Sequence, residues 1–407
     1  MSSSVWSSDN SSETADNILG NEFKGNIIND NNDNKYIIIY KLGCGSFSSV
    51  WLSYSLYDKQ LVAIKIYHPR DYSESVREIE IYDKINKSNI NKDYLLSSLN
   101  IFEIEPIITN PNYYNNDDTI NKHNVIVLPL MAISTYDLLD YYEDGLDHKI
   151  ILIILKQLFL GLMEFEKLNL CHTDLKPENI LLCGRTYKME YIENYINTLN
   201  LNIQMDDDLL QNYCKLIQNK IDDYDNDDDN NKGDMIIDKY LDNINIKLCD
   251  FNLSIEYNKI NNYNDYQTRY YRSPEIILGY KLHKKSDYWS IPCIIFELLT
   301  CDILFDPKKT DKMTTDMVHL YLIIELLGDI PEKMIKNSPN YKILFNKNKI
   351  KGIDYKIKNW KLNDVILEYD LKNTNELKIL INIMNDMLII NPEKRYDLNY
   401  FLTNYLN

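Results

Sequence analysis

The first third of the chain contains short runs of apolar residues, one of them alternating with polar positions, that are typical of β-strands. Three such runs, rich in β-branched and aromatic residues, occupy residues 35–43 ("KYIIIYKLG"), 48–56 ("SSVWLSYSL") and 60–67 ("QLVAIKIY"). Residues 72–85 instead place apolar side chains at helical spacing, and residues 123–131 ("HNVIVLPLM") return to a strand pattern. These runs predict a small β-rich unit that carries one helix.

Beyond Met131 the apolar pattern changes to the longer period of helices. Residues 148–168, 286–300 and 319–328 each form a long apolar stretch with few polar positions, which predicts buried helices. The longest apolar run lies in the first of them. It contains a lysine and a glutamine and is too short to span a bilayer, so it is interpreted as a core helix.

The order of these segments predicts an α+β fold with two lobes. The chain has 407 residues, of which 44% are apolar, and this is enough for two sizeable cores. We place a β-rich N-lobe at residues 36–131 and a larger helical C-lobe at residues 132–407. No internal repeat is visible.

Two polar segments stand apart from this pattern. Residues 1–35 are rich in Ser, Asn and Asp and lack an apolar period, so we predict a disordered tail. Residues 184–245 are rich in Asn and Asp, and we predict a mostly mobile spacer inserted in the C-lobe, with some helix near "YIENYINTLNLNI".

Charge and cysteine content narrow the classes of function. The net charge of −17 disfavours direct binding to nucleic acid or to anionic membranes. It suits a basic partner, although it could equally serve solubility alone. The seven cysteines are scattered and form no C-x-x-C pair, and the N-terminus has no secretory pattern. We therefore expect an intracellular protein, cytoplasmic with nuclear access, that works as a monomer.

The β-rich unit contains candidate phosphate-binding groups. Gly43 and Gly45 directly follow a predicted strand, where their backbone could approach phosphates, although glycine pairs also form ordinary hairpin turns. Lys65 ends the "VAIK" run, and Glu78 lies on the predicted helix. These two either orient nucleotide phosphates as a pair or form a surface salt bridge, and the residues alone do not decide between the two readings.

The helical lobe contains the strongest motif, "CHTDLKPENILL". Asp174, Lys176 and Asn179 share one short loop, in which they would act as catalytic base, phosphate-neutralising cation and metal ligand. Asp250 follows an apolar run in "IKLCDFNLS", where it would hold magnesium, with Phe251 packed beneath it. Chance occurrence of the whole first string is very improbable.

Three further charged residues support this loop. Glu275 in "SPE" is expected to pair with a buried arginine, for which Arg395 in "NPEKRYDL" is the natural candidate. Asp287 in "SDYWS" is expected to brace the catalytic loop from its helix. Each could by itself be an ordinary cap or surface charge, but their order along the chain is consistent with one site.

The ordered set of motifs resembles the eukaryotic protein kinases over residues 36 to 405. "YRSPEIILG", with Arg272 before the serine, resembles the CMGC group of kinases. "HTDLKPENILL" and "HLYLIIELLGDIPEKMI" resemble the SR-protein kinases within that group, and the long spacer is placed as in that family. The resemblance implies the bilobal protein kinase fold.

The same resemblance implies roles for individual residues and the cofactors ATP and Mg²⁺. Leu128 is similar to the gatekeeper, Met131 to the hinge residue that offers its N–H to adenine, and Thr268 to the threonine that hydrogen-bonds near the catalytic aspartate in Ser/Thr kinases. Further ATP-binding positions implied by the family motifs are Leu42, Gly43, Gly45, Ser46, Val50, Ala63, Lys65 and Asn179.

Three positions depart from the general kinase pattern. Thr173 replaces the arginine that usually binds an activation-loop phosphate, so we expect activity without loop phosphorylation. Asn252 replaces the glycine after Asp-Phe, and asparagine tolerates left-handed backbone better than most residues. Ser48 stands where a third glycine would be expected, as in the SR-protein kinases.

Two classes of function fit these observations. The first is a serine/threonine kinase for basic, Arg/Ser-rich proteins, and the second is a pseudokinase that binds ATP as a scaffold. Asn252 is the main support for the scaffold, against five intact positions: Lys65, Glu78, Asp174, Asn179 and Asp250. Phosphate transfer that depends on Asp174 distinguishes them.

Overall fold

The chain forms two compact units, which are described separately. The computed structural model describes residues 23–45, 47–105, 122–142, 144–227, 234–257, 266–353 and 357–406. The first unit, here called the sheet unit, takes the chain up to Lys87 and adds residues 96–132 and 184–241. The second, the helical unit, takes residues 88–95, 133–183 and 242–407. Residues 184–241 thus belong with the β-rich unit, although the sequence interpretation placed the spacer in the C-lobe.

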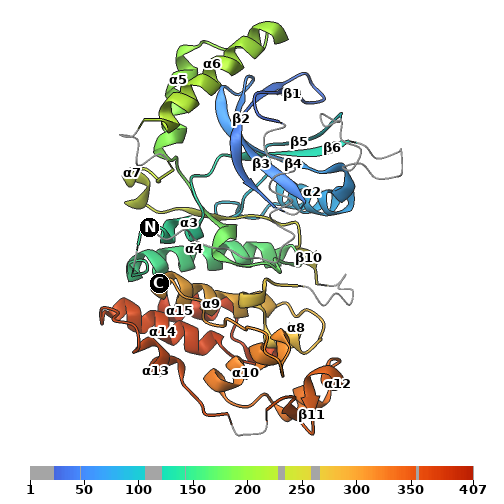
Figure 1. Ribbon diagram of the computed structural model, residues 1–407, viewed down its shortest axis with the longest axis vertical. Coiled ribbons are helices and arrows are strands. Elements are labelled where there is room, and N and C mark those ends of the chain that lie inside the picture. Colours follow the sequence, from blue (N-terminus) through green and yellow to red (C-terminus); the bar gives the residue numbers. More distant parts are fainter. Residues whose placement is uncertain are drawn as a thin grey trace. The chain divides into compact units, whose positions relative to one another are not determined.

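A six-stranded antiparallel sheet forms the centre of the sheet unit (Figure 1). The strand order is β1-β2-β3-β4-β6-β5. Helix α2 (Tyr72–Lys87) is the helix that the sequence predicted at residues 72–85. The strands are β1 (Ile27–Asn29), β2 (Lys35–Cys44), β3 (Ser48–Ser55), β4 (Gln60–Tyr67), β5 (Asn100–Ile104) and β6 (His123–Pro129). A 3-10 turn, η1 (Pro69–Asp71), precedes α2. The strands predicted at 35–43, 48–56, 60–67 and 123–131 are therefore confirmed.

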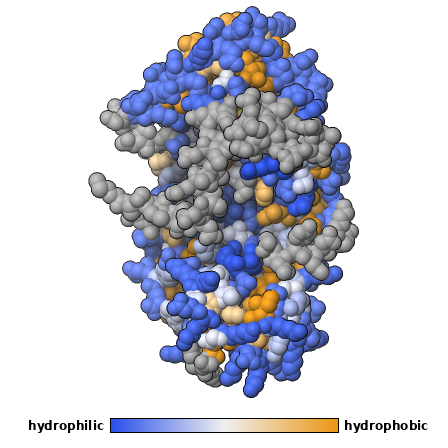
Figure 2. Space-filling view, turned by 45° about the vertical axis from the view of Figure 1, so that its right-hand side comes forward, coloured by the Kyte–Doolittle hydropathy of each residue, from blue (hydrophilic) through white to orange (hydrophobic). Residues whose placement is uncertain are grey.

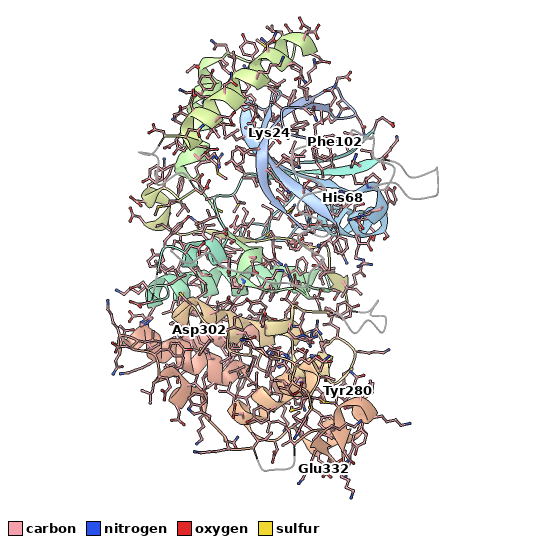
Figure 3. The ribbon with its side chains drawn as sticks, in the orientation of Figure 1. Lys24, His68, Phe102, Tyr280, Asp302 and Glu332 are labelled. Atoms are coloured by element: carbon pink, nitrogen blue, oxygen red, sulfur yellow. The ribbon has the colours of Figure 1, made fainter. Side chains whose placement is uncertain are left out.

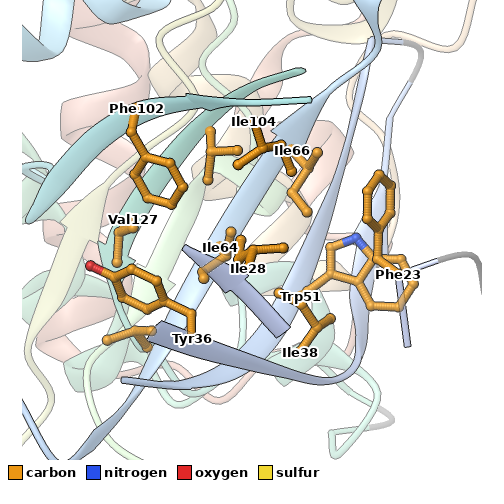
Figure 4. Close-up of a cluster of buried hydrophobic side chains, with 12 residues drawn as sticks. Phe23, Ile28, Tyr36, Ile38, Trp51, Ile64, Ile66, Phe102, Ile104 and Val127 are labelled. Carbon is orange, nitrogen blue, oxygen red and sulfur yellow. The ribbon is translucent and has the colours of Figure 1, made fainter. Parts of the chain in front are cut away.

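The residues just before β2 complete the core of the sheet unit. Phe23 lies 5.8 Å from Trp51 and 5.4 Å from His123 between ring centroids, and Ile28 is 3% exposed in the same cluster (Figure 4). Strand β1 pairs with β2 in antiparallel register. The predicted disordered tail, residues 1–35, therefore extends too far, because the structure is ordered over residues 23–35. The error arose because isolated apolar residues among Asn and Asp show no period in the sequence. Residues 1–22 lie outside the described residues.

The spacer is folded over most of its length, which corrects the expectation of a mobile insertion. It contains α5 (Tyr187–Thr198), α6 (Asp207–Asp225) and α7 (Asp238–Leu241). In α6 the buried residues recur at helical spacing and face the sheet unit, since α6 contacts β1 and β2. These are Leu210, Cys214, Ile217, Ile221 and Tyr224. Residues 228–233 of the spacer lie outside the described residues.

Polar side chains connect α6 to other parts of the sheet unit. Gln218 Nε2 donates to the Ile39 carbonyl of β2 at 2.7 Å. Lys35 Nζ lies 2.8 Å from Asp207 Oδ1, and Lys24 Nζ lies 3.9 Å from Asp222 Oδ1 (Lys24 is labelled in Figure 3). Three aspartates that suggested a mobile segment thus have structural roles: Asp206 is the N-cap of α6, and Asp207 and Asp222 pair with lysines of the sheet unit.

The docking of α6 gives a first testable prediction. Ile217→Ala should lower the free energy of unfolding by about 2 kcal/mol or more, because the side chain is 1% exposed and its removal leaves a cavity. Leu216→Ala is the matched control, since Leu216 is the neighbouring residue and is 45% exposed. Denaturant unfolding of both variants measures the difference. Equal, small effects would mean that α6 does not pack on the sheet.

The helical unit is built around α4 (His148–Lys167) and α9 (Ser286–Thr300). Both are buried along most of their length, as the sequence predicted, and α10 (Thr315–Leu327) matches the third predicted helix. The remaining helices are α3 (Thr135–Leu139), α8 (Pro274–Ile277), α11 (Glu332–Lys336), α12 (Tyr341–Leu344), α13 (Leu362–Ile366), α14 (Asn375–Met387) and α15 (Leu398–Tyr405). Short 3-10 turns lie at η3 (Pro177–Asn179), η4 (Arg269–Tyr271) and η5 (Pro392–Lys394).

Three two-stranded antiparallel sheets position the loops of the helical unit. Strand β7 (Leu170–Cys171) pairs with β10 (Ile255–Glu256), and β8 (Ile180–Leu182) pairs with β9 (Ile246–Leu248). The third pair is β11 (Phe345–Asn346) with β12 (Lys349–Ile350). The first two pairs bracket the loop of residues 172–179 and the residues that follow β9.

The surface carries few large apolar side chains. On the face shown in Figure 2, hydrophilic side chains predominate and apolar ones lie in small separate patches. Among the described residues, Leu367 is 80% exposed and Ile343 is 60% exposed. No helix in the described part of the chain is both long and apolar enough to cross a membrane.

Candidate active site

The β2–β3 hairpin has the open backbone that a glycine-rich phosphate loop requires. Gly43 lies opposite Val50, and the Gly45 N–H donates to the Ser48 carbonyl at 2.9 Å. A Cβ atom added at either glycine would meet nothing within 4 Å, so packing within the described chain does not demand glycine here. This open space fits a backbone that a bound group approaches closely. Ser46, predicted to bind ATP, lies outside the described residues.

Lys65 and Glu78 form a buried ion pair rather than a surface salt bridge. Lys65 Nζ on β4 lies 2.7 Å from Glu78 Oε2 on α2, and the two side chains are 8% and 0% exposed. The same Glu78 oxygen accepts a hydrogen bond from the Tyr67 hydroxyl. Tyr67 was not singled out from the sequence, although its place two positions after Lys65 puts both side chains on one face of the strand.

The predicted adenine-binding positions lie together on β4, β6 and the residues that follow. Ala63 is directly opposite Leu128 in the β4–β6 pairing, and both are less than 8% exposed. Met131 is 9% exposed at the end of the sheet unit. The spacer also contributes here, because Arg185 Nη1 donates to the Leu130 carbonyl at 3.3 Å. Arg185 belongs to no motif, so this contact could not be predicted from the sequence.

The helical unit gathers the residues of the predicted catalytic loop around Asp174. Asp174 Oδ1 accepts the Thr268 hydroxyl at 2.6 Å and the Thr268 N–H at 3.1 Å. Lys176 Nζ lies 3.2 Å from Asp174 Oδ2, and Asn179 Nδ2 donates to the Asp174 carbonyl at 2.8 Å. The contact expected between Thr268 and Asp174 is therefore present, although 93 residues separate them in the sequence.

The carboxylates around Lys176 stabilise its charged form. Burial opposes the ammonium most strongly, but Asp174 and Glu178 outweigh it and raise the pKa of Lys176. Burial raises the pKa of Glu178 itself. Lys176 is therefore a permanent cation beside the Asp174 carboxylate near neutral pH, as a group that neutralises phosphate charge must be.

Asp287 makes the contacts that the sequence predicted with the loop of residues 172–179. Its carboxylate accepts the N–H groups of His172 at 2.7 Å and Thr173 at 2.9 Å. Thr173 has a φ of 67°, a left-handed conformation that costs energy for a β-branched residue. Its hydroxyl donates to the Leu253 carbonyl at 2.7 Å. Where most kinases have an arginine, this chain thus has a threonine that ties the loop to the segment after Asp250.

The segment around Asp250 is held by ring packing. Phe251 is fully buried, 5.1 Å from Phe165 and 5.8 Å from His172 between ring centroids. The left-handed residue is Asp250, with a φ of 60°, and Asn252 is not among the residues of positive φ. The tolerance of asparagine for left-handed backbone, which we invoked for Asn252, is therefore not needed in this conformation.

Two arginines anchor the residues that precede and begin α8, at the end of the segment that runs from Asp250 to Glu275. Arg395 makes a bidentate pair with Glu275, with N–O distances of 2.8 and 2.7 Å, and both side chains are at most 2% exposed. Arg272 donates through Nε and Nη2 to the Gln267 carbonyl at 3.0 and 2.9 Å. Gln267 is buried with a φ of 68°, and no signal in the sequence marked it. Residues 258–265 of this segment lie outside the described residues.

A buried carboxyl group predicts a pH dependence of stability. Tyr271 donates to Glu297 Oε2 at 2.6 Å, and burial raises the pKa of Glu297 from 4.5 to about 7. Because the folded state then binds the proton more tightly than the unfolded state, stability present below pH 4.5 is lost as pH rises through 7. The loss reaches on the order of 3 kcal/mol by pH 8.

Unfolding in urea between pH 5 and 8 measures this loss. Glu297→Gln should flatten the decline, because an amide accepts the same hydroxyl without titrating. Glu325→Gln on α10 is the control, since Glu325 is only partly buried and hydrogen-bonds to Tyr321. An unchanged slope in Glu297→Gln would show that this carboxyl titrates normally.

The comparisons with known proteins place this geometry in a family. The protein kinase domain family matches residues 36–190 and 233–405, and the unmatched residues between them contain α6 and most of α5. A solved structure, "Crystal structure of PF14_0431, kinase domain", has a TM-score of 0.61 at 19% identity and covers 93% of this chain and 97% of its own. The fold is therefore the protein kinase fold, and this chain belongs to the protein kinase family.

Several relatives define the branch of that family. The serine/threonine-protein kinase SRPK of Physarum polycephalum is 30% identical over 371 residues, which cover 88% of this chain and 83% of that protein. Protein kinase dsk1 of Schizosaccharomyces pombe is 26% identical over 444 residues, covering 90% and 79%. A putative serine/threonine-protein kinase, L205, of Acanthamoeba polyphaga mimivirus is 25% identical over 474 residues, covering 88% and 84%. The chain is a serine/threonine protein kinase similar to the SR-protein kinases of the CMGC group.

Proposed function

We propose that this kinase transfers the γ-phosphate of ATP to serine or threonine in basic, Arg/Ser-rich proteins, with Mg²⁺ as cofactor. The observation that supports the chemistry most directly is the set of contacts around Asp174 from Thr268, Lys176 and Asn179. The resemblance to SR-protein kinases and the net charge of −17 support the substrate class.

Asp174 is proposed as the catalytic base. The substrate hydroxyl oxygen bonds to the γ-phosphorus of ATP, the bond from that phosphorus to the ADP oxygen breaks, and the hydroxyl proton passes to the Asp174 carboxylate. Thr268 fixes the carboxylate through Oδ1, and Lys176 lies beside Oδ2. Lys176 would offset the charge of the transferring phosphoryl group.

Asp250 and Asn179 are proposed as the metal ligands. Their oxygen donors suit Mg²⁺, which usually binds one or two protein side chains and completes its shell with phosphates and water. The Asn179 amide nitrogen is turned toward Asp174, so its oxygen is directed away from that bond. When bound, Mg²⁺ would neutralise charge on the β- and γ-phosphates.

The remaining positions are proposed to hold the nucleotide. Lys65, oriented by Glu78, would contact the α- and β-phosphates, and the Met131 N–H would bond adenine. The other members of this set are Leu42, Gly43, Gly45, Ser46, Val50, Ala63 and Leu128. We also propose that transfer does not need a phosphorylated activation segment, because Thr173 replaces the arginine that would bind it.

The cellular setting is part of the proposal. The seven cysteines are scattered along the sequence and form no C-x-x-C pair, and five of them are buried or partly buried. This fits a reducing compartment, so we place the kinase in the cytoplasm with access to the nucleus, as a monomer.

Two peptides test the substrate class. The purified chain is incubated with Mg²⁺, labelled ATP and either an Arg-Ser repeat or a Ser-Pro repeat, with Asp174→Ala as the inactive control. Label on the Arg-Ser peptide that is lost in the control is the expected result. Label on the Ser-Pro peptide alone would reject the Arg/Ser assignment and move the kinase elsewhere in the CMGC group.

A further inference from the structure

Tyr67 contacts the Lys65–Glu78 pair, although it belongs to none of the sequence motifs described above. Its ring is 1% exposed, and its hydroxyl donates to Glu78 Oε2, the oxygen that Lys65 Nζ approaches to 2.7 Å. Lys65 Nζ also lies 5.3 Å from the centroid of the Tyr67 ring. Tyr67 therefore touches both members of the pair, one through its hydroxyl and the other through the face of its ring.

Tyr67 is itself fixed in the sheet. It is the last residue of β4, opposite Ser48 of β3, and its carbonyl accepts a hydrogen bond from His123 Nδ1 on β6 at 2.8 Å. The strand on each side thus sets the position of the ring. A hydroxyl placed in this way is a stationary donor for a carboxylate on α2.

Helix α2 has a further tie to the sheet near its first turn. Asn124 Nδ2 on β6 donates to Ser75 Oγ at 2.7 Å, and Ser75 Oγ donates to the Tyr72 carbonyl. Ser75 and Glu78 lie one turn apart on α2, and both are fully buried. The sheet therefore holds α2 at two successive turns, and the Tyr67 hydroxyl acts at the turn that carries Glu78.

We propose that Tyr67 is a positioning residue that keeps Glu78 paired with Lys65 in the free enzyme. This rests on the proposed function, because it assigns Lys65 to the nucleotide phosphates. A carboxylate that accepts the Tyr67 hydroxyl in addition to Lys65 leaves its position less readily than one that lacks this hydroxyl. Without the hydroxyl, Glu78 would lie away from Lys65 for a larger fraction of the time. The apparent nucleotide affinity would then fall in proportion to the population in which the pair is formed.

Tyr67→Phe tests this proposal, because it removes the hydroxyl and keeps the ring. We expect the Kd for ADP and the KM for ATP to rise about tenfold with kcat changed less than twofold, since bound nucleotide draws the pair together. In a Glu78→Gln background the same change should have little further effect on the Kd for ADP. Tyr54→Phe is the control, as Tyr54 is another buried tyrosine of the sheet unit.

The outcomes separate the positioning role from the proposed function. ADP titration needs no phosphate transfer, so it tests the role of Tyr67 independently of catalysis. A wild-type protein that binds ADP but transfers no phosphate would count against the proposed function and not against the role of Tyr67. An unchanged Kd for ADP in Tyr67→Phe would overturn the positioning role. So would a tenfold rise that persists in the Glu78→Gln background, because the hydroxyl would then act through something other than Glu78. A lower melting temperature with unchanged Kd and KM would reduce Tyr67 to a core residue.

Discussion

Asp174→Ala is expected to reduce phosphate transfer by about a thousandfold or more and to leave the affinity for ADP within a few-fold of the wild type. The proposed base then has no replacement, because Lys176 and Thr268 near it cannot accept the proton at neutral pH. Incorporation of labelled phosphate and ADP titration measure the two quantities separately.

An exposed carboxylate provides the control for this variant. Asp222→Ala changes an aspartate of α6 that is 62% exposed, and it should transfer phosphate at the wild-type rate. Transfer by Asp174→Ala within tenfold of the wild type would mean that another group accepts the proton. Loss of ADP binding in the same variant would point to a disrupted fold instead.

Arg395→Met is expected to lower the free energy of unfolding by about 3–5 kcal/mol. The substitution leaves the Glu275 carboxylate buried without its bidentate partner, and an uncompensated buried charge is among the costliest single defects. Arg395 also lies over the Trp289 ring, 5.3 Å from its centroid, so packing is lost as well. Denaturant unfolding of the purified variant measures the change.

The neighbouring residue provides the matched control for Arg395. Lys394→Met removes a positive charge one position away, but Lys394 is exposed, so its effect should stay within about 0.5 kcal/mol. Equal effects of the two variants would contradict a structural role for the Glu275–Arg395 pair. Replacing Glu275 as well, by Gln in the Arg395→Met background, should recover part of the loss, because no buried charge then remains.

The geometry of the candidate site could be predicted from the sequence because most of its residues lie in short strings. Asp174, Lys176 and Asn179 fall within six consecutive residues, so one loop conformation brings them together. Thr268 reaches the same carboxylate across a long sequence separation, and only the family resemblance indicated that contact. The Glu275–Arg395 pair was likewise inferred from two distant motifs, and its geometry is present.

The spacer could not be predicted because its composition concealed its period. The apolar positions of α6 recur at helical spacing, but Asn and Asp fill the positions between them and lower the mean hydropathy of the segment. Asp206 caps this helix by accepting the Leu209 N–H at 2.8 Å. An aspartate run that suggested disorder therefore contains the start of a helix. The burial of Phe23 could not be predicted for the same reason, because Phe23 is a single apolar residue in a polar segment.

The departures from the common kinase pattern have different structural outcomes. Thr173 is held by Asp287 and bonded to the Leu253 carbonyl, so it has a role of its own in the loop. Asn252 lies beside a left-handed Asp250 and its buried Oδ1 has no hydrogen-bond partner in the described part of the chain. Neither departure removes a group that the proposed chemistry requires.

Phosphoamino acid analysis identifies the type of residue that this kinase phosphorylates. The purified chain is incubated with Mg²⁺, γ-labelled ATP and a basic Arg/Ser-rich protein, and the label is assigned to serine, threonine or tyrosine after hydrolysis. We predict labelled phosphoserine, formed only when Mg²⁺ is present and Asp174 is intact. Tight ADP binding with no label on the protein or on the kinase itself, or label on tyrosine alone, would contradict this prediction.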